Sequence, residues 1–118
     1  MRASRGEIKI EEILKEAELT FKMEYIFPDL KSPNGRPLRF DFVVFDDDGK
    51  IDFIIEYQGK QHYEQSVKFG GKKGFYQQQY HDRQKRTFSA LHDFRLIEIP
   101  YTDENLISYD YIMKLAGY

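Results

Sequence analysis

The chain has 118 residues, a length that suits one domain spanning residues 1 to 118. Its formal net charge is −2, which argues against a chain that is basic over its whole surface, as many nucleic-acid binders are. No cysteine is present, which excludes disulfides, thiolate metal sites and a cysteine nucleophile. We expect a cytoplasmic protein without membrane attachment, because cysteine is absent, no apolar run approaches membrane length and the first residues do not resemble a signal peptide.

The chain begins with one helix and one strand. Ser4-x-x-Glu7 is a capping-box pattern, and the apolar residues that follow recur at helical spacing. This predicts a helix over about residues 5 to 18. Residues 20 to 27 are rich in β-forming side chains and predict a strand that ends at Pro28.

The next elements predict a hairpin. A loop dense in turn residues covers 31 to 37, and two β-rich runs follow over 38 to 45 and 51 to 57. Asp48-Gly49 lies between these runs and is a strong short-range hairpin signal.

The second half of the chain predicts a helix, a strand and a last helix. A glycine-rich loop over 69 to 74 precedes a helix from about 75 to 92, and residues 94 to 99 predict a buried strand. Asp103 is expected to cap a final helix that runs to about residue 116. The order α-β-β-β-α-β-α predicts an α/β fold with a central mixed sheet of four strands flanked by helices.

The predicted hairpin brings two acids together. A two-residue turn at Asp48-Gly49, counted back along both strands, pairs Asp41 with Glu56 on one face, with Cβ atoms about 5 Å apart. Arg39 and Gln58 would share that face, whereas a three-residue turn would shift the pairing. Opposed like charges destabilise a sheet, so a divalent cation such as Mg²⁺ is a natural partner where phosphate is the substrate. The alternative, in which both acids point to solvent from an edge hairpin, has equal weight on periodicity alone.

Basic residues gather in one later segment. Between residues 68 and 86 a single acid stands among six basic residues, which are Lys68, Lys72, Lys73, Arg83, Lys85 and Arg86. This local excess could meet a phosphate backbone or form a solvated surface.

Several acids, an amide and a histidine follow one another along the chain in the order of a known motif. The set consists of Glu7, Asp41, Glu56-x-Gln58-Gly59, His62 and Asp82. It resembles the PD-(D/E)XK nuclease superfamily, and most closely the branch of very-short-patch repair endonucleases and E-D-x-H-D homing endonucleases. The resemblance covers nearly the whole chain. It implies a restriction-endonuclease-like fold and Mg²⁺-dependent, or Mn²⁺-dependent, hydrolysis of double-stranded DNA by the catalytic domain of a homing or repair-type endonuclease.

The resemblance also assigns metal ligands. Asp41 matches the metal-binding Asp of the superfamily and Glu56 matches the acid of (D/E)-x-K. Both are expected to hold the metal with the backbone carbonyl of Tyr57. Gln58 stands where the motif has lysine, which in the family is thought to orient or activate the attacking water. A neutral glutamine can orient a water but cannot supply that charge.

Three further residues match the E-D-x-H-D pattern. His62 is expected to act as a general base or acid, although a histidine here also suits a plain loop. Glu7 could simply complete the helix cap, yet it shares a helical face with apolar residues. Asp82 lies in a polar stripe with Gln78, Lys85 and Ser89 that faces either solvent or the cleft, and we expect the cleft.

Double-stranded DNA is the expected partner, and the residues expected to contact its backbone are Lys68, Lys72, Lys73 and Lys85. No helix-turn-helix or zinc motif is present, so site-specific cleavage would require a homodimer or a DNA-binding segment outside this chain. Two alternatives stay open. One is a catalytically inactive nucleic-acid-binding domain of the same fold, which the glutamine at position 58 supports, and the other is an RNA-processing nuclease.

Overall fold

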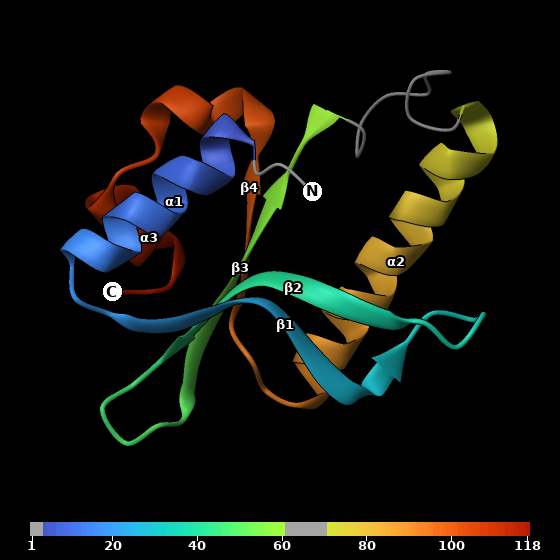
Figure 1. Ribbon diagram of the computed structural model, residues 1–118, viewed down its shortest axis with the longest axis horizontal. Coiled ribbons are helices and arrows are strands. Elements are labelled where there is room, and N and C mark those ends of the chain that lie inside the picture. Colours follow the sequence, from blue (N-terminus) through green and yellow to red (C-terminus); the bar gives the residue numbers. More distant parts are fainter. Residues whose placement is uncertain (1–3, 61–70) are drawn as a thin grey trace.

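The computed structural model describes residues 4–60 and 71–118 and has a four-stranded mixed sheet with helices on both faces (Figure 1). Along the chain the elements are α1 (Arg5–Glu16), β1 (Thr20–Lys31), β2 (Pro37–Phe45), β3 (Ile51–Gln58), α2 (Gly71–Leu91), β4 (Leu96–Pro100), the 3₁₀ helix η3 (Tyr101–Leu106) and α3 (Tyr109–Leu115). The predicted α/β fold and the predicted order of helices and strands are confirmed, and η3 is added. In the part of the chain that the structure describes, no helix is long and apolar enough to cross a membrane.

The strands lie in the order β1-β2-β3-β4. β1 with β2 and β2 with β3 pair antiparallel, whereas β3 and β4 pair parallel. The parallel pair requires a crossover connection, and α2 lies in that connection. β3 is therefore central in the sheet and covered on both faces, which explains why residues 53–58 are all buried.

Each face of the sheet has its own core. On one face α1 and α3 pack against β2, β3 and β4, and the fully buried residues there include Ile10, Leu14, Phe53 and Ile112. On the other face Phe88 of α2 packs with aromatic and aliphatic residues of β1, β2 and β3. The candidate site lies on this second face, because Lys85 of α2 reaches β3 there.

The first turn of α1 lies directly on β3. Ser4 caps the helix as predicted, since its Oγ accepts a hydrogen bond from the backbone N–H of Glu7 (3.2 Å). The Glu7 carboxylate accepts a bond from the same hydroxyl (2.9 Å). A Cβ on Gly6 would lie 2.2 Å from Cζ of Tyr57, so only glycine allows this close approach.

Three predicted boundaries are wrong. β1 continues through Pro28 to Lys31, because β1 is an edge strand and an edge tolerates a residue without a backbone N–H. α2 begins at Gly71, so part of the expected glycine-rich loop is helical. Asp103 does not cap the last helix; Ser108 does, since its Oγ accepts from the backbone N–H of Tyr111 (3.0 Å).

The hairpin turn is longer than predicted. The backbone N–H of Asp46 donates to Lys50 (2.8 Å) and that of Gly49 donates to Asp46 (3.0 Å), which leaves three residues in the connection. Gly49 has a φ of 81°, and Oδ1 of Asp46 accepts from the backbone N–H groups of Asp48 and Lys50, both at 2.9 Å. The two-residue turn is therefore wrong.

The predicted register is nevertheless correct beyond the turn. Phe45 pairs with Ile51, but Val44 pairs with Phe53, so Asp52 is an extra residue in β3. This β-bulge reverses the one-residue shift that the longer turn introduces. Phe42 consequently pairs with Ile55, as the shorter turn would have required.

Candidate functional site

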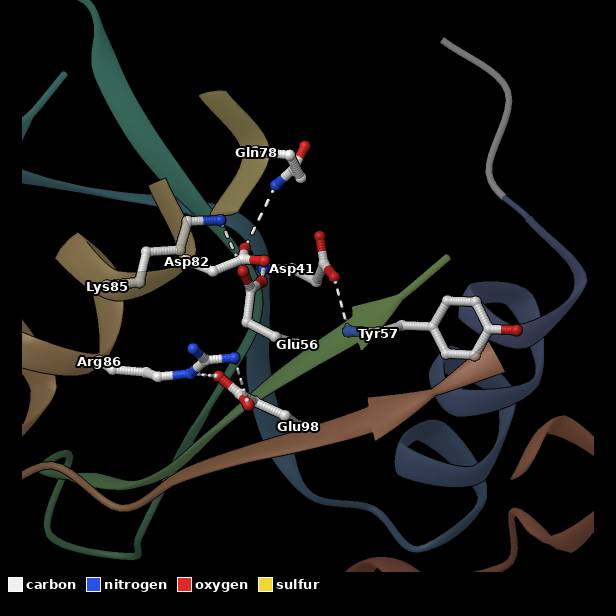
Figure 2. A network of polar contacts seen from close by, with 8 residues as sticks. All are labelled: Asp41, Glu56, Tyr57, Gln78, Asp82, Lys85, Arg86 and Glu98. Atoms are coloured by element: carbon white, nitrogen blue, oxygen red, sulfur yellow. Dashed lines mark hydrogen bonds and ion pairs between the residues drawn. The ribbon is translucent and has the colours of Figure 1, made fainter. Parts of the chain in front are cut away.

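Asp41 and Glu56 lie side by side where β2 and β3 separate (Figure 2). The backbone N–H of Asp41 donates to Oε2 of Glu56 (2.7 Å), and the backbone N–H of Tyr57 donates to Oδ2 of Asp41 (2.8 Å). Each carboxylate thus accepts a hydrogen bond from the opposite strand, beyond the Phe42–Ile55 pair. The predicted juxtaposition of the two acids is confirmed.

Burial makes this pair of like charges costly. Glu56 is only 6% exposed. Burial first, and then the neighbouring charges of Glu56 and Glu7, raise the pKa of Asp41 from 3.8 to about 8, against the lowering effects of the Tyr57 N–H and of Lys85. The two acids do not simply point to solvent; burial favours a protonated Asp41, and a nearby positive charge favours its ionised form.

Lys85 provides one such charge from α2. Its Nζ lies 2.5 Å from Oε1 of Glu56, and the two side chains are 13% and 8% exposed. The ammonium also lies 5.6 Å from the ring centroid of Phe40. The sequence reading assigned Lys85 to a phosphate contact; the structure places it beside the acid of the Glu56-x-Gln58 element.

The polar stripe of α2 faces the sheet, as expected for Asp82. Asp82 and Ser89 are 7% and 2% exposed, and Nε2 of Gln78 donates to Oδ1 of Asp82 (3.2 Å). Gln78, Asp82 and Lys85 lie on the side of α2 that is turned toward Glu56 of β3 (Figure 2). The alternative of a solvent-facing stripe is wrong, because Asp82 and Ser89 are buried.

A second ion pair lies next to the first and was missed from the sequence. Glu98 of β4 is the register partner of Glu56, and its two carboxylate oxygens accept from Nε and Nη2 of Arg86 at 2.7 and 3.1 Å. Residues paired in parallel strands point to the same face, so Asp41, Glu56 and Glu98 form a row of acids across three strands (Figure 2). In the sequence, the only signal for this second ion pair was that two basic residues, Lys85 and Arg86, are adjacent.

The other predicted site residues have varied surroundings. Gln58, the last residue of β3, is buried. The Tyr57 ring lies on the opposite face, where its hydroxyl donates to Glu104 (3.3 Å) and where burial, followed by Glu104, raises its pKa to about 12; only its backbone can serve the site. Glu7 is partly buried and close enough to raise the pKa of Asp41.

Two predicted residues, His62 and Lys68, lie outside the described residues. Lys72 and Lys73 are exposed in the first turn of α2, where basic side chains can meet a polyanion. Their assignment to the DNA backbone stays a prediction.

The acids fit a hard divalent cation. Mg²⁺ is bound in proteins by one or two carboxylates together with waters and substrate phosphates, and two adjacent, repelling carboxylates supply that donor set. Within residues 4–60 and 71–118, no three or more histidine or acidic side chains are arranged as a complete protein cage. That Asp41, Glu56 and the carbonyl of Tyr57 hold a metal ion stays a prediction.

Comparisons with known proteins leave the family open. No family model matches the chain, and no solved structure matches it. The chain is similar to an uncharacterized protein, 307L, of Invertebrate iridescent virus 6, with 35% identity over 96 residues that cover 77% of this chain. The matched region is 49% of the viral protein, so the chain spans about half the length of this relative.

Proposed function

We propose that this chain is the catalytic domain of a metal-dependent endonuclease that hydrolyses phosphodiester bonds in DNA. The observation that carries the proposal is the buried pair Asp41 and Glu56, whose carboxylates accept hydrogen bonds across two diverging strands while Lys85 approaches from α2. Buried like charges with a strongly raised pKa are typical of functional sites. The resemblance of the Asp41…Glu56-x-Gln58 order to PD-(D/E)XK nucleases supports the same reaction class.

Asp41, Glu56 and the Tyr57 carbonyl would hold the metal. When bound, Mg²⁺ or Mn²⁺ supplies positive charge to a phosphoryl oxygen and lowers the pKa of a bound water. Gln58 would orient that water through its amide. His62 is proposed as a proton acceptor, and Glu7 and Asp82 would set the negative field around the acids.

Lys85 offers the charge that Gln58 cannot. Its ammonium contacts the same carboxylate that the motif's lysine would neighbour, although it comes from α2. We propose that it stabilises negative charge on the reacting phosphate, with Lys68, Lys72 and Lys73 along the DNA backbone. The absence of cysteine suits the cytoplasmic location that we propose.

The test is cleavage of a supercoiled plasmid in Mg²⁺ or Mn²⁺. Asp41→Ala should abolish conversion to nicked or linear DNA, since removing one metal ligand removes the metal's contribution. Asp47→Ala, which removes an exposed acid of the hairpin turn, is the matched control and should cut normally. Near wild-type cleavage by Asp41→Ala would contradict the assignment of Asp41 as a metal ligand. An RNA of the same sequence distinguishes the RNA-processing alternative.

A second candidate is a non-catalytic nucleic-acid-binding domain. One observation favours it: Glu56 is satisfied by Lys85 and by a backbone N–H without any metal. Calorimetric titration with Mg²⁺ and Mn²⁺ separates the two candidates. Binding that Asp41→Ala removes supports the nuclease, and no binding supports the non-catalytic domain. Target recognition would depend on a homodimer or on a segment outside this chain.

A further inference from the structure

A pocket lies between α2 and the turn that joins β1 to β2. It has a volume of about 440 Å³ and is lined by residues 32–34 of the turn and by one side of α2 that includes Lys73, Tyr76, Tyr80 and His81. The turn is held to the helix, because Nε2 of Gln84 donates to the backbone carbonyl of Lys31 (3.1 Å). One wall of the pocket is therefore tied to the other by a hydrogen bond.

Two exposed tyrosine rings form one wall. Tyr76 and Tyr80 are 53% and 43% exposed and lie one helical turn apart. Each ring has a cation near it: Nζ of Lys72 is 6.0 Å from the centroid of Tyr76, and Cζ of Arg83 is 5.8 Å from that of Tyr80. Aromatic rings interleaved with basic side chains are the features on which single-stranded nucleic acids stack.

The charge of the pocket favours an anion-bearing ligand. None of its lining residues is acidic, and Lys73 is among them. Lys72 and Arg83 flank the tyrosines on the same helix, and exposed Arg36 lies in the neighbouring turn. A neutral ring ligand alone would not need these cations, whereas a base attached to a phosphodiester chain would meet both the rings and the charges.

The pocket and the acids lie on different sides of α2. On α2, a rise of about 1.5 Å and a turn of about 100° per residue place Tyr80 and Tyr76 roughly 8 and 14 Å along the helix axis from Lys85 and roughly 140° and 180° around it. The pocket is therefore a surface separate from the acids, on the side of the helix that faces residues 32–34.

We propose that this pocket binds unpaired bases of a DNA strand by stacking them on Tyr76 and Tyr80. The proposal rests on the proposed function for the identity of the strand. It adds a preference for DNA with an unpaired stretch, such as a flap, a gap or a melted site, over a continuous duplex.

The test is fluorescence anisotropy in EDTA, with the whole chain and three labelled probes: a single-stranded oligonucleotide, the same sequence as a blunt duplex, and the same sequence as RNA. Replacing Tyr76 and Tyr80 together by alanine should weaken single-strand binding by at least about tenfold, and leave duplex binding unchanged. The corresponding double phenylalanine variant should keep most of the affinity, because phenylalanine preserves the stacking surface. Tyr109→Ala, an equally exposed tyrosine on α3, is the control and should bind as wild type.

Salt dependence separates stacking from phosphate contact. The slope of log affinity against log salt for the single strand should stay the same without the two tyrosines, since no phosphate contact is lost. The proposal is overturned by unchanged single-strand affinity in the double alanine variant, by an equal loss for the duplex, or by tyrosine dependence for RNA but not DNA. The binding assay contains EDTA and does not depend on a metal. A protein that binds single strands through the two tyrosines but does not cleave the plasmid would therefore refute the proposed nuclease activity and leave the proposed base-binding pocket standing.

Discussion

Lys85 and Glu56 form a nearly buried ion pair between α2 and β3, with Nζ 2.5 Å from Oε1. When one partner of a buried ion pair is removed, the other partner is left as an uncompensated buried charge. Lys85→Met should therefore lower the free energy of unfolding by about 3–5 kcal/mol in EDTA. Arg86→Met is the matched control, because the Arg86–Glu98 pair is more exposed and should cost about 1 kcal/mol or less. Urea denaturation measures the free energy of unfolding of both variants. Equal losses in the two variants would contradict the larger stabilising effect that we expect for the buried Lys85–Glu56 pair.

Divalent metal should rescue the Lys85→Met variant. If Glu56 is a metal ligand, Mg²⁺ or Mn²⁺ replaces the lost positive charge, and binding to the folded state alone raises stability. The variant should also bind the metal more tightly than wild type, because no ammonium competes for the carboxylate. Denaturation curves recorded with and without metal check this. A variant that gains no more from metal than wild type would show that Glu56 is not a ligand.

Asp41 should make the metal-free protein less stable as pH rises. Its pKa is raised to about 8 in the folded protein, so between about pH 4 and pH 8 the folded state holds a proton that the unfolded state has lost. Stability from this group is present below pH 4 and is lost toward pH 8, by at most about 1.4 kcal/mol per pH unit. Asp41→Asn should remove that slope, as seen in the difference between two stability–pH curves. Parallel curves would mean that Asp41 titrates normally.

Asp41→Asn and Glu56→Gln should both abolish cleavage but differ in stability. At pH 8 in EDTA, Asp41→Asn should be as stable as wild type or more so, because it relieves repulsion with Glu56. From the sequence alone, the opposed like charges predict that removing either acid relieves the repulsion. Glu56→Gln instead leaves buried Lys85 without its partner and should be destabilised. Thermal unfolding of both variants at pH 8 distinguishes them, and equal stability would contradict this asymmetry.

The basic start of α2 should govern salt dependence. Replacing Lys72 and Lys73 by alanine should weaken binding to all duplex sequences alike and flatten the slope of log affinity against log salt by ~0.9 per lost phosphate contact. Lys85 is left out of this variant, because it is paired with Glu56 and its removal would also change the stability of the fold. Lys15→Ala, on the exposed side of α1, is the control. An unchanged slope in the double variant would move the DNA path elsewhere.

The sequence alone determined the order of the elements and the pair of acids. Periodicity of apolar residues reports which side of a helix or strand faces inward, and hairpin partners are close in sequence, so Asp41 and Glu56 could be placed opposite each other. The predicted turn was one residue too short, and the bulge at Asp52 restored the pairing. Neither the turn length nor the bulge could be read from alternation, because Asp46-Asp47-Asp48-Gly49 is compatible with more than one turn.

Only the tertiary structure decided what surrounds the acids. Lys85 reaches Glu56 because α2 crosses over the sheet between β3 and β4, and Glu98 becomes the neighbour of Glu56 through the parallel pairing that this crossover creates. Position 6 requires a glycine because α1 lies directly on the ring of Tyr57. Local pattern tells which residues are turned inward but not which distant element covers them, since that depends on how the faces pack. The charge balance of the site was therefore beyond what sequence periodicity could specify.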